Sequence, residues 1–417
     1  MRGKYYRNIT QGLGVAAFLI VTMMSVPGAL GASKFKILHS FTGYDGSAPS
    51  GLVFDGAGNL YGTTASGGSF NSGTVFELTP NHEGTWTEKL LYSFCSLTNC
   101  SDGETPLGTL IFDQAGNLYG TTFNGGSTIC LSGCGTVFKL THNSDGTWTE
   151  SVLYSFGVPP DGGEVEAGLV FDGSGNLYGT TVSGGSFDSG TVFELTRRGE
   201  GTWTESVLHN FTGGEDGGFP SFRLIFDRTG DLYSTTPDGG THNKGVVFEL
   251  TPNSNGSWTE NVLHQFGDEK DDCFPSAGLT FDGSGNLYGT IDCVFGAVFQ
   301  LTPNSDGSWK ENVLHRFNGR KGGFNPIGDL IFDQSGNLYG TTLDGGNPDC
   351  EGFNGCGVVF ALAPNSNGEW EEKVLHGFFH HPAAFPLSVI FGSAGNLYGV
   401  TEGDSNTALG TVFEITP

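Results

Sequence analysis

Basic residues are scarce in this sequence: 18 lysines and arginines stand against 44 aspartates and glutamates, for a formal net charge of −26. Nucleic-acid binding needs a basic footprint that neutralises phosphates, so this charge balance excludes nucleic acid as a partner. The carboxylates keep an exported protein soluble, and their alternative use is to bind a cation. We therefore predict no cofactor, with calcium as the alternative.

The motifs of several large enzyme classes are also missing. The sequence contains no G-x-S-x-G elbow, no H-E-x-x-H, no Walker loop and no G-x-G-x-x-G between a strand and a helix. No two acidic residues recur as an evident acid/base pair. We therefore predict no catalytic residue.

Long apolar runs are absent except near the N-terminus. Basic residues precede the apolar segment 13–24, and small residues follow it at 29–32. This order is typical of a secretory signal peptide, and the apolar core is shorter than the roughly 20 residues that a membrane span needs. We assign residues 1–32 to a signal peptide and expect an extracellular or periplasmic protein, without a membrane partner after cleavage. The alternative is an uncleaved N-terminal anchor.

Glycine is abundant, with 70 residues, and the glycines fall at fixed positions of a repeat. The stretch 51–80 reads GLVFDGAGNLYGTTASGGSFNSGTVFELTP, which predicts three short strands joined by turns. A fourth run follows at 86–94, and the NLYG landmark occurs seven times if DLYS at 231–234 is included. Four-stranded units of about 40–50 residues, repeated about 4–8 times, are typical of a β-propeller.

The two ends of the repeat array complement each other. Six runs of the fourth-strand type follow a third strand, whereas the seventh lies at 34–41, before any complete unit. The last unit stops after its third strand, at 411–416. The N-terminal strand can therefore complete the last blade and leave no open sheet edge. We predict an all-β, seven-bladed propeller of four-stranded antiparallel blades over residues 33–417; the alternative is a solenoid.

Eight cysteines form four pairs of near neighbours in the sequence. These pairs are Cys95/Cys100, Cys130/Cys134, Cys273/Cys293 and Cys350/Cys356. In an exported protein an even number indicates disulfides; zinc is the alternative, although no spacing is that of a zinc knuckle. All eight lie in links after a second or a fourth strand, which emerge on one face of an up-and-down blade. We call this the loop face and expect function there.

Histidine and aspartate recur at fixed positions, which we interpret as structural. One fourth-strand position holds histidine in five blades and tyrosine in two; the histidines are His39, His209, His264, His315 and His376. An aspartate ends the first strand of six units, where it is expected to cap a tight turn; a ring of calcium ligands is the alternative.

Three further features supply candidate ligand-binding residues. The residue just before the first-strand run is small in five units, whereas it is Arg223 in one unit and Asp329 in another. These two residues either pair across the channel, bind a polar ligand or are chance substitutions. Phenylalanines recur before four consecutive blades, to stack on a ligand or to pack under the loop: Phe219, Phe274, Phe324 and Phe385. His380 and His381 are adjacent in the link before the last blade.

The motifs NLYGTT, GTVFELTP and WTE-V-L-x-F occur together in several units across the chain. This pattern resembles the bacterial GloVer-repeat proteins, the choice-of-anchor tandem repeat family. The resemblance implies an exported, propeller-like bacterial protein and supplies no catalytic residues. Relatives often carry a C-terminal anchoring segment, whereas this sequence ends inside its last repeat, which favours release.

We therefore expect a secreted, monomeric, non-enzymatic recognition or scaffold propeller that binds an extracellular glycan or protein through its loop face. The alternative is a lactonase- or lyase-like propeller enzyme with a metal or polar site at the channel mouth. Such an enzyme should place several Asp, Glu, His or Asn residues there, where this sequence has mostly Gly, Ser and Thr.

Overall fold

The computed structural model describes residues 33–130, 133–157, 159–267, 273–347, 350, 355–379, 383–403 and 409–417. The predicted signal peptide and the candidates His380 and His381 lie outside these described residues. Residues 32–417 form one unit. Within the described ranges, no helix is long and apolar enough to cross a membrane.

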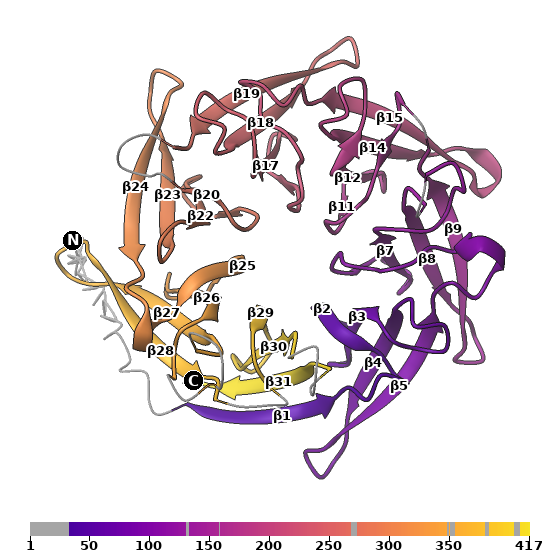
Figure 1. Cartoon of the computed structure of the whole chain (residues 1–417), viewed down its shortest axis with the longest axis horizontal. Coiled ribbons are helices and arrows are strands. Elements are labelled where there is room, and N and C mark those ends of the chain that lie inside the picture. The colour runs from indigo at the N-terminus through magenta and orange to yellow at the C-terminus, as the bar shows by residue number, and fades with distance from the viewer. Residues whose placement is uncertain are drawn as a thin grey trace, which may run out of the picture. The chain divides into compact units, whose positions relative to one another are not determined.

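Each blade is an antiparallel sheet whose strands follow one another along the chain. The first blade contains β2 (Ser47–Phe54), β3 (Leu60–Ser66), β4 (Thr74–Pro80) and β5 (Trp86–Ser93), paired in that order. Within the unit 32–417, seven such sheets stand side by side in a ring, as predicted, with the first strand of each blade innermost (Figure 1).

The other blades repeat this order. The second blade has β6 (Ile111–Phe112), β7 (Leu118–Thr122), β8 (Thr136–His142) and β9 (Trp148–Ser155), and the third has β11 (Val170–Phe171), β12 (Leu177–Thr181), β14 (Thr191–Arg197) and β15 (Trp203–Asn210). The fourth blade has β16 (Ile225–Phe226), β17 (Leu232–Thr236), β18 (Val246–Pro252) and β19 (Trp258–Gln265), and the fifth has β20 (Phe274–Pro275), β21 (Thr280–Phe281), β22 (Leu287–Asp292), β23 (Ala297–Pro303) and β24 (Trp309–Arg316). The sixth blade has β25 (Phe324–Phe332), β26 (Leu338–Asp344), β27 (Val358–Pro364) and β28 (Trp370–Gly377). Short elements are β10 (Gly162–Gly163), β13 (Ser183–Gly184) and the 3₁₀ turns η1 (Thr98–Cys100), η2 (Gly199–Gly201) and η3 (Arg320–Gly322).

The last blade is closed by the N-terminal strand, as predicted. It contains β29 (Pro386–Phe391), β30 (Leu397–Thr401) and β31 (Thr411–Thr416), and β1 (Lys34–Ser40) pairs antiparallel with β31. Phe35 lies opposite Ile415, and Ile37 lies opposite Phe413. Figure 1 shows β1, at the indigo end of the chain, alongside the yellow β31. The two ends of the repeat array therefore form one sheet.

The blades are joined by two aromatic contacts that recur at all seven interfaces. The tyrosine of each NLYG motif meets a first-strand phenylalanine of the next blade edge to face, with ring centroids 5.0–5.1 Å apart; examples are Tyr61–Phe112 and, across the closure, Tyr398–Phe54. A second pair joins the phenylalanine after each fourth strand to the next third strand at 4.9–5.4 Å, from Phe94–Phe138 to Phe41–Phe76. Edge-to-face pairs add to the energy of burial. The closing interface has the same packing as the others.

Glycine before the third strand lets adjacent blades approach closely. A Cβ on Gly73 would lie 2.4 Å from the ring of Pro106 in the next blade, and its φ of +96° also favours glycine. Gly190, Gly296, Gly357 and Gly410 have the same relation to prolines of the following blades. The recurrence of glycine before the third strand thus has a packing reason.

Candidate functional site

The recurring aspartates at the ends of the first strands cap their own turns, and this prediction is confirmed. Oδ1 of Asp113 accepts the N–H groups of Ala115 and Asn117 at 2.9 Å, while Oδ2 accepts Nδ2 of Asn117 at 2.7 Å and the Tyr119 hydroxyl at 3.1 Å. Burial would raise the pKa of Asp113, but these hydrogen bonds together lower it. Turns of this kind recur at Asp55, Asp172, Asp227, Asp282 and Asp333. Their carboxylate oxygens are therefore already used within the turn.

All four predicted cysteine pairs are disulfides: Cys95–Cys100, Cys130–Cys134, Cys273–Cys293 and Cys350–Cys356. Three of them bridge residues within a single link. The bond between Cys273 and Cys293 is different, because it ties the link that enters the fifth blade to the link between β22 and β23. Disulfides are typical of proteins from oxidising compartments.

Four of these cysteines are buried, namely Cys134, Cys273, Cys350 and Cys356, and two of the four, Cys134 and Cys356, also contact the following blade. Each of these two is only 1% exposed and lies two residues before a third strand, β8 or β27. The carbonyl of Cys134 accepts the N–H of Glu164 at 2.8 Å, and the carbonyl of Cys356 accepts the N–H of Phe385 at 2.9 Å. Both donors lie in the link that enters the following blade. Cys134 and Cys356 therefore help to join adjacent blades and offer no surface to a ligand.

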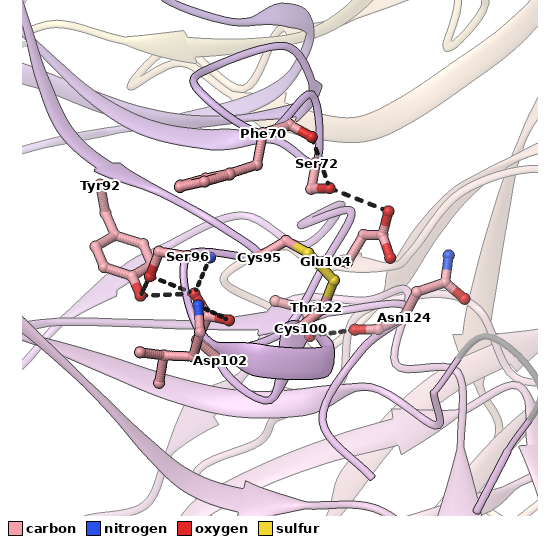
Figure 2. Close-up of a disulfide and its surroundings, with 11 residues drawn as sticks. Phe70, Ser72, Tyr92, Cys95, Ser96, Cys100, Asp102, Glu104, Thr122 and Asn124 are labelled. Atoms are coloured by element: carbon pink, nitrogen blue, oxygen red, sulfur yellow. Dashed lines mark hydrogen bonds between the residues drawn. A yellow bond between two sulfur atoms is a disulfide. The ribbon is translucent and has the colours of Figure 1, made fainter. Parts of the chain in front are cut away.

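An aspartate anchors the link between the first and second blades, beside the first disulfide (Figure 2). Asp102 is fully buried; it accepts hydrogen bonds from the Tyr92 hydroxyl at 2.7 Å and from the N–H of Ser96 at 2.8 Å. Asp45, Asp161 and Asp216 anchor the corresponding links of other blades. Burial first, and repulsion from Asp102 second, raise the pKa of Glu150 in the next blade. Sequence reasoning missed this neighbouring pair of carboxylates, because its members come from different blades.

The repeated histidine or tyrosine of the fourth strand contacts a carboxylate in several blades, which agrees with a structural role. His39 lies 2.8 Å from Asp45, and Tyr154 donates to Asp161 at 3.1 Å. His376 instead stacks on Phe35, with ring centroids 3.9 Å apart and planes 4° from parallel. This position therefore belongs to the blade interfaces.

Large apolar side chains that stay exposed gather on the loop face. Of the twelve such residues in the described ranges, ten lie in links after a second or a fourth strand: Tyr44, Phe70, Leu97, Ile129, Phe187, Phe219, Phe274, Val294, Phe295 and Phe379. The other two, Ile37 and Leu90, lie on β1 and β5. None of the twelve lies in the short turns of the opposite face. The two faces of the ring thus differ in character.

The Cys273–Cys293 bond holds an apolar group that sequence reasoning missed in part. Phe274 follows one cysteine and is 39% exposed, while Val294 and Phe295 follow the other and are 84% and 43% exposed. Only Phe274 was a candidate; the signal for the other two was their place beside a cysteine. We call Phe274, Val294 and Phe295 the blade-5 knuckle.

The four candidate phenylalanines are not equivalent. Phe219 and Phe385 have positive φ and directly precede a proline, and Phe274 also precedes one. In the sixth blade the residue with positive φ before the proline is Asn325, so Phe324 lies one position earlier in the link than the other phenylalanines. Phe324 is partly buried and packs edge to face on Phe295, at 6.0 Å between centroids. Phe219 and Phe274 are the two that remain exposed.

The candidates Arg223 and Asp329 form an ion pair in the wall of the central channel. Nε and Nη2 of Arg223 lie 3.2 and 3.1 Å from Oδ2 of Asp329, and the Gly278 N–H donates to Oδ1 at 3.0 Å. The fourth and sixth blades are thus bridged across the fifth. A Cβ on residue 278 would lie 2.6 Å from Oδ1, so the bridge depends on glycine there. Of the three interpretations considered, pairing across the channel is the one the structure has.

The channel encloses a cavity of about 620 Å³ with mostly apolar and small lining residues. Besides Arg223 and Asp329, two carboxyl groups line it: Glu166 of the third blade and Glu402 of the last. Burial raises the pKa of both. Sequence reasoning missed them because each lies outside the one repeat position that was compared. No cluster of three or more His, Cys, Asp or Glu side chains in the described ranges is arranged to hold a metal.

Comparisons with known proteins place the chain in a family and leave its activity open. A search of the curated proteins finds no match. Among solved structures, the chain is similar to a gluconolactonase from Xanthomonas campestris, with 15% identity, a TM-score of 0.38, and coverage of 67% of this chain and 81% of that one. It is also similar to a putative oxidoreductase (glucose dehydrogenase) from Thermus thermophilus, with 14% identity, a TM-score of 0.40, and coverage of 92% and 100%. Likeness at this level carries no argument about function.

The family model of the Gloeobacter/Verrucomicrobia repeat matches residues 22–199, 130–346 and 292–417, which together include all seven units. This agrees with the resemblance noted from the NLYGTT, GTVFELTP and WTE motifs. The chain belongs to the Gloeobacter/Verrucomicrobia repeat family.

Proposed function

We propose that this protein is an exported, non-enzymatic recognition or scaffold propeller whose loop face binds an extracellular glycan or protein. The observation that carries this proposal is the placement of ten of twelve exposed large apolar side chains on that face. Exposed apolar side chains are common when scattered singly, whereas their collection on one face is typical of an interaction surface. The polar, uniform turns of the opposite face supply an internal comparison.

The blade-5 knuckle is the best-prepared part of this surface. Its three side chains follow two cysteines that are bonded to each other, so two separate links are held in one arrangement. Cys273 is 2% exposed, which anchors the bond in the fifth blade. Binding costs less entropy when the contacting loops are already ordered. We therefore expect the knuckle to be the centre of the binding surface.

The alternative is a propeller enzyme that acts at the channel. It is favoured by the Arg223–Asp329 pair and by the two carboxyl groups, Glu166 and Glu402, that share the cavity. Against it, both nitrogen contacts of the guanidinium are made to Asp329, and that carboxylate is also held by the N–H of Gly278. Arg223 and Asp329 therefore already have partners within the channel wall.

The test is a binding screen of the purified mature chain on glycan and extracellular-protein arrays. A triple variant, Phe274→Ser, Val294→Ser and Phe295→Ser, should lose binding, because truncating a central apolar contact costs about 2 kcal/mol or more. Leu90→Ser is the matched control, since Leu90 is 38% exposed but lies on β5, away from the loop face. Binding that survives the triple variant but is lost in Arg223→Ala would refute the loop-face proposal and favour the channel.

A further inference from the structure

The glutamate of the WTE motif recurs at the interfaces between blades. It is present on six fourth strands as Glu88, Glu150, Glu205, Glu260, Glu311 and Glu372. In Glu88, Glu150, Glu205, Glu260 and Glu372, one oxygen, Oε1, is buried and has no hydrogen-bond partner. A carboxylate with such an oxygen is costly when ionised, because that oxygen has left water without gaining a donor. The charge of these glutamates therefore needs a physical explanation.

At four interfaces this glutamate lies beside the aspartate that anchors the preceding link. The pairs are Asp45 with Glu88, Asp102 with Glu150, Asp161 with Glu205 and Asp216 with Glu260. The aspartate receives the hydrogen bonds: Asp161, for example, accepts from Tyr154 and from the N–H of Gly157 at 2.8 Å. Among the described ion pairs, none joins these carboxylates to a lysine or arginine. Two carboxylates so placed repel each other.

The two remaining described variants of the interface avoid this repulsion. In the sixth blade, Gly322 stands where the other links have aspartate, and Glu372 reaches over it to lie 3.4 Å from His315. In the last blade, Phe35 takes the place of the glutamate and stacks on His376. In both variants the side chain at the glutamate position, Glu372 or Phe35, lies beside a histidine of the preceding blade. At the four paired interfaces, both carboxylates are present, so their repulsion must be relieved by a different means.

We propose that the glutamate of each paired interface takes up a proton in mild acid, because its buried Oε1 has no hydrogen-bond donor, and that adjacent blades are therefore held together more tightly in mild acid than in alkali. Burial first, and repulsion from the aspartate second, raise the pKa of Glu88, Glu150, Glu205 and Glu260 to about 7. The free side chain has a pKa of 4.5, so the folded protein binds more protons than the unfolded chain between these two values. The stabilisation is complete below pH 4.5 and is lost as the pH rises through 7.

Other titrating groups face these carboxylates, and they decide which interfaces give the cleanest test. His39 faces the Asp45 pair and His209 the Asp216 pair, and burial lowers the pKa of His209, which works in the opposite direction. The Asp102 and Asp161 pairs are faced instead by Tyr92 and Tyr154, whose pKa values are raised above their ordinary value, chiefly by burial. At these two interfaces tyrosine replaces histidine at the fourth-strand position, so Glu150 and Glu205 are the residues to change.

The experiment compares unfolding of the mature chain and of the double variant Glu150→Gln, Glu205→Gln at pH 5.5, 7 and 8.5. Glutamine resembles the protonated acid at every pH. The wild-type unfolding constant should rise by up to about tenfold per pH unit for each interface in the window. The double variant should have a shallower dependence and be the more stable protein at pH 8.5. Glu83→Gln, in an exposed turn, is the matched control and should follow the wild type.

Three results would overturn the proposal. The first is a double variant that is less stable than the wild type at pH 8.5, and the second is an unchanged pH dependence. The third is a wild type that regains its low-pH stability at pH 8.5 when calcium is added, because a cation would then occupy the pair. If the double variant does not fold, infrared absorption of protonated carboxyl groups in the wild type at pH 6, absent at pH 8.5, decides the question.

Discussion

Replacing Phe41 by alanine tests whether the ring is closed in solution. Phe41 is 6% exposed, and its ring packs edge to face on Phe76 of the first blade with centroids 5.1 Å apart. Truncating a buried phenylalanine costs about 3–5 kcal/mol, because contacts are lost and a cavity remains. With an unfolding entropy of roughly 2.1 cal/mol/K per residue, a cooperative unit of this length should melt about 4–6 °C lower. Thermal unfolding followed by tryptophan fluorescence measures the shift.

Phe94→Ala is the matched control for this prediction. Phe94 is fully buried and packs on Phe138 at 4.9 Å, at an interface that the chain crosses without interruption. A closed ring predicts similar shifts for both variants, since the two interfaces have the same packing. If Phe94→Ala lowers the melting temperature while Phe41→Ala leaves it unchanged, β1 does not complete the last blade and the closed ring is refuted.

Two further predictions concern the channel wall and the closing strand. Gly278→Ala would bring a Cβ to 2.6 Å from Oδ1 of Asp329, so urea unfolding should show that the free energy of unfolding falls by about 1–3 kcal/mol. Gly283→Ala is the control, because open space surrounds Gly283 and the substitution should have little effect. Equal losses of stability in the two variants would contradict the geometry of the channel wall. His376, stacked on Phe35, has its pKa lowered to about 4 by burial, so it stays neutral in the folded protein, and stability should fall as the pH drops from about 6.5 towards 4. His376→Phe should reduce that loss in thermal melts, and an identical acid profile would count against a buried neutral imidazole.

The architecture could be predicted because its signals are local and repeated. Seven NLYG landmarks indicate the number of blades, and the single fourth-strand run at 34–41 indicates how the ring closes. The turn aspartates and three of the disulfides likewise depend on residues only a few positions apart. The first strands were the weakest part, because four of the blades, as at β6, keep only two residues of regular pairing there.

The polar contacts between blades could be predicted only in part, because they depend on which blades meet in space. The sequence offered pairing of Arg223 with Asp329 as one of three interpretations, but it did not decide among them, since the two residues are 106 positions apart and their contact also needs the absence of a side chain on Gly278. The partnership of Asp102 with Glu150 likewise crosses a blade interface. A repeat position compared down the sequence identifies equivalent residues, but it does not reveal which different positions become neighbours.

Because β1 pairs with β31, the propeller could be built from a chain that begins and ends at a different point of the ring. Lys34 lies opposite Thr416, so a short peptide could splice the two extremities of the propeller. The spliced chain could then be cut in a polar hairpin such as 81–85, where chain breaks are best tolerated. A circular permutant of this kind would be translated in a different order and still assemble the same seven interfaces.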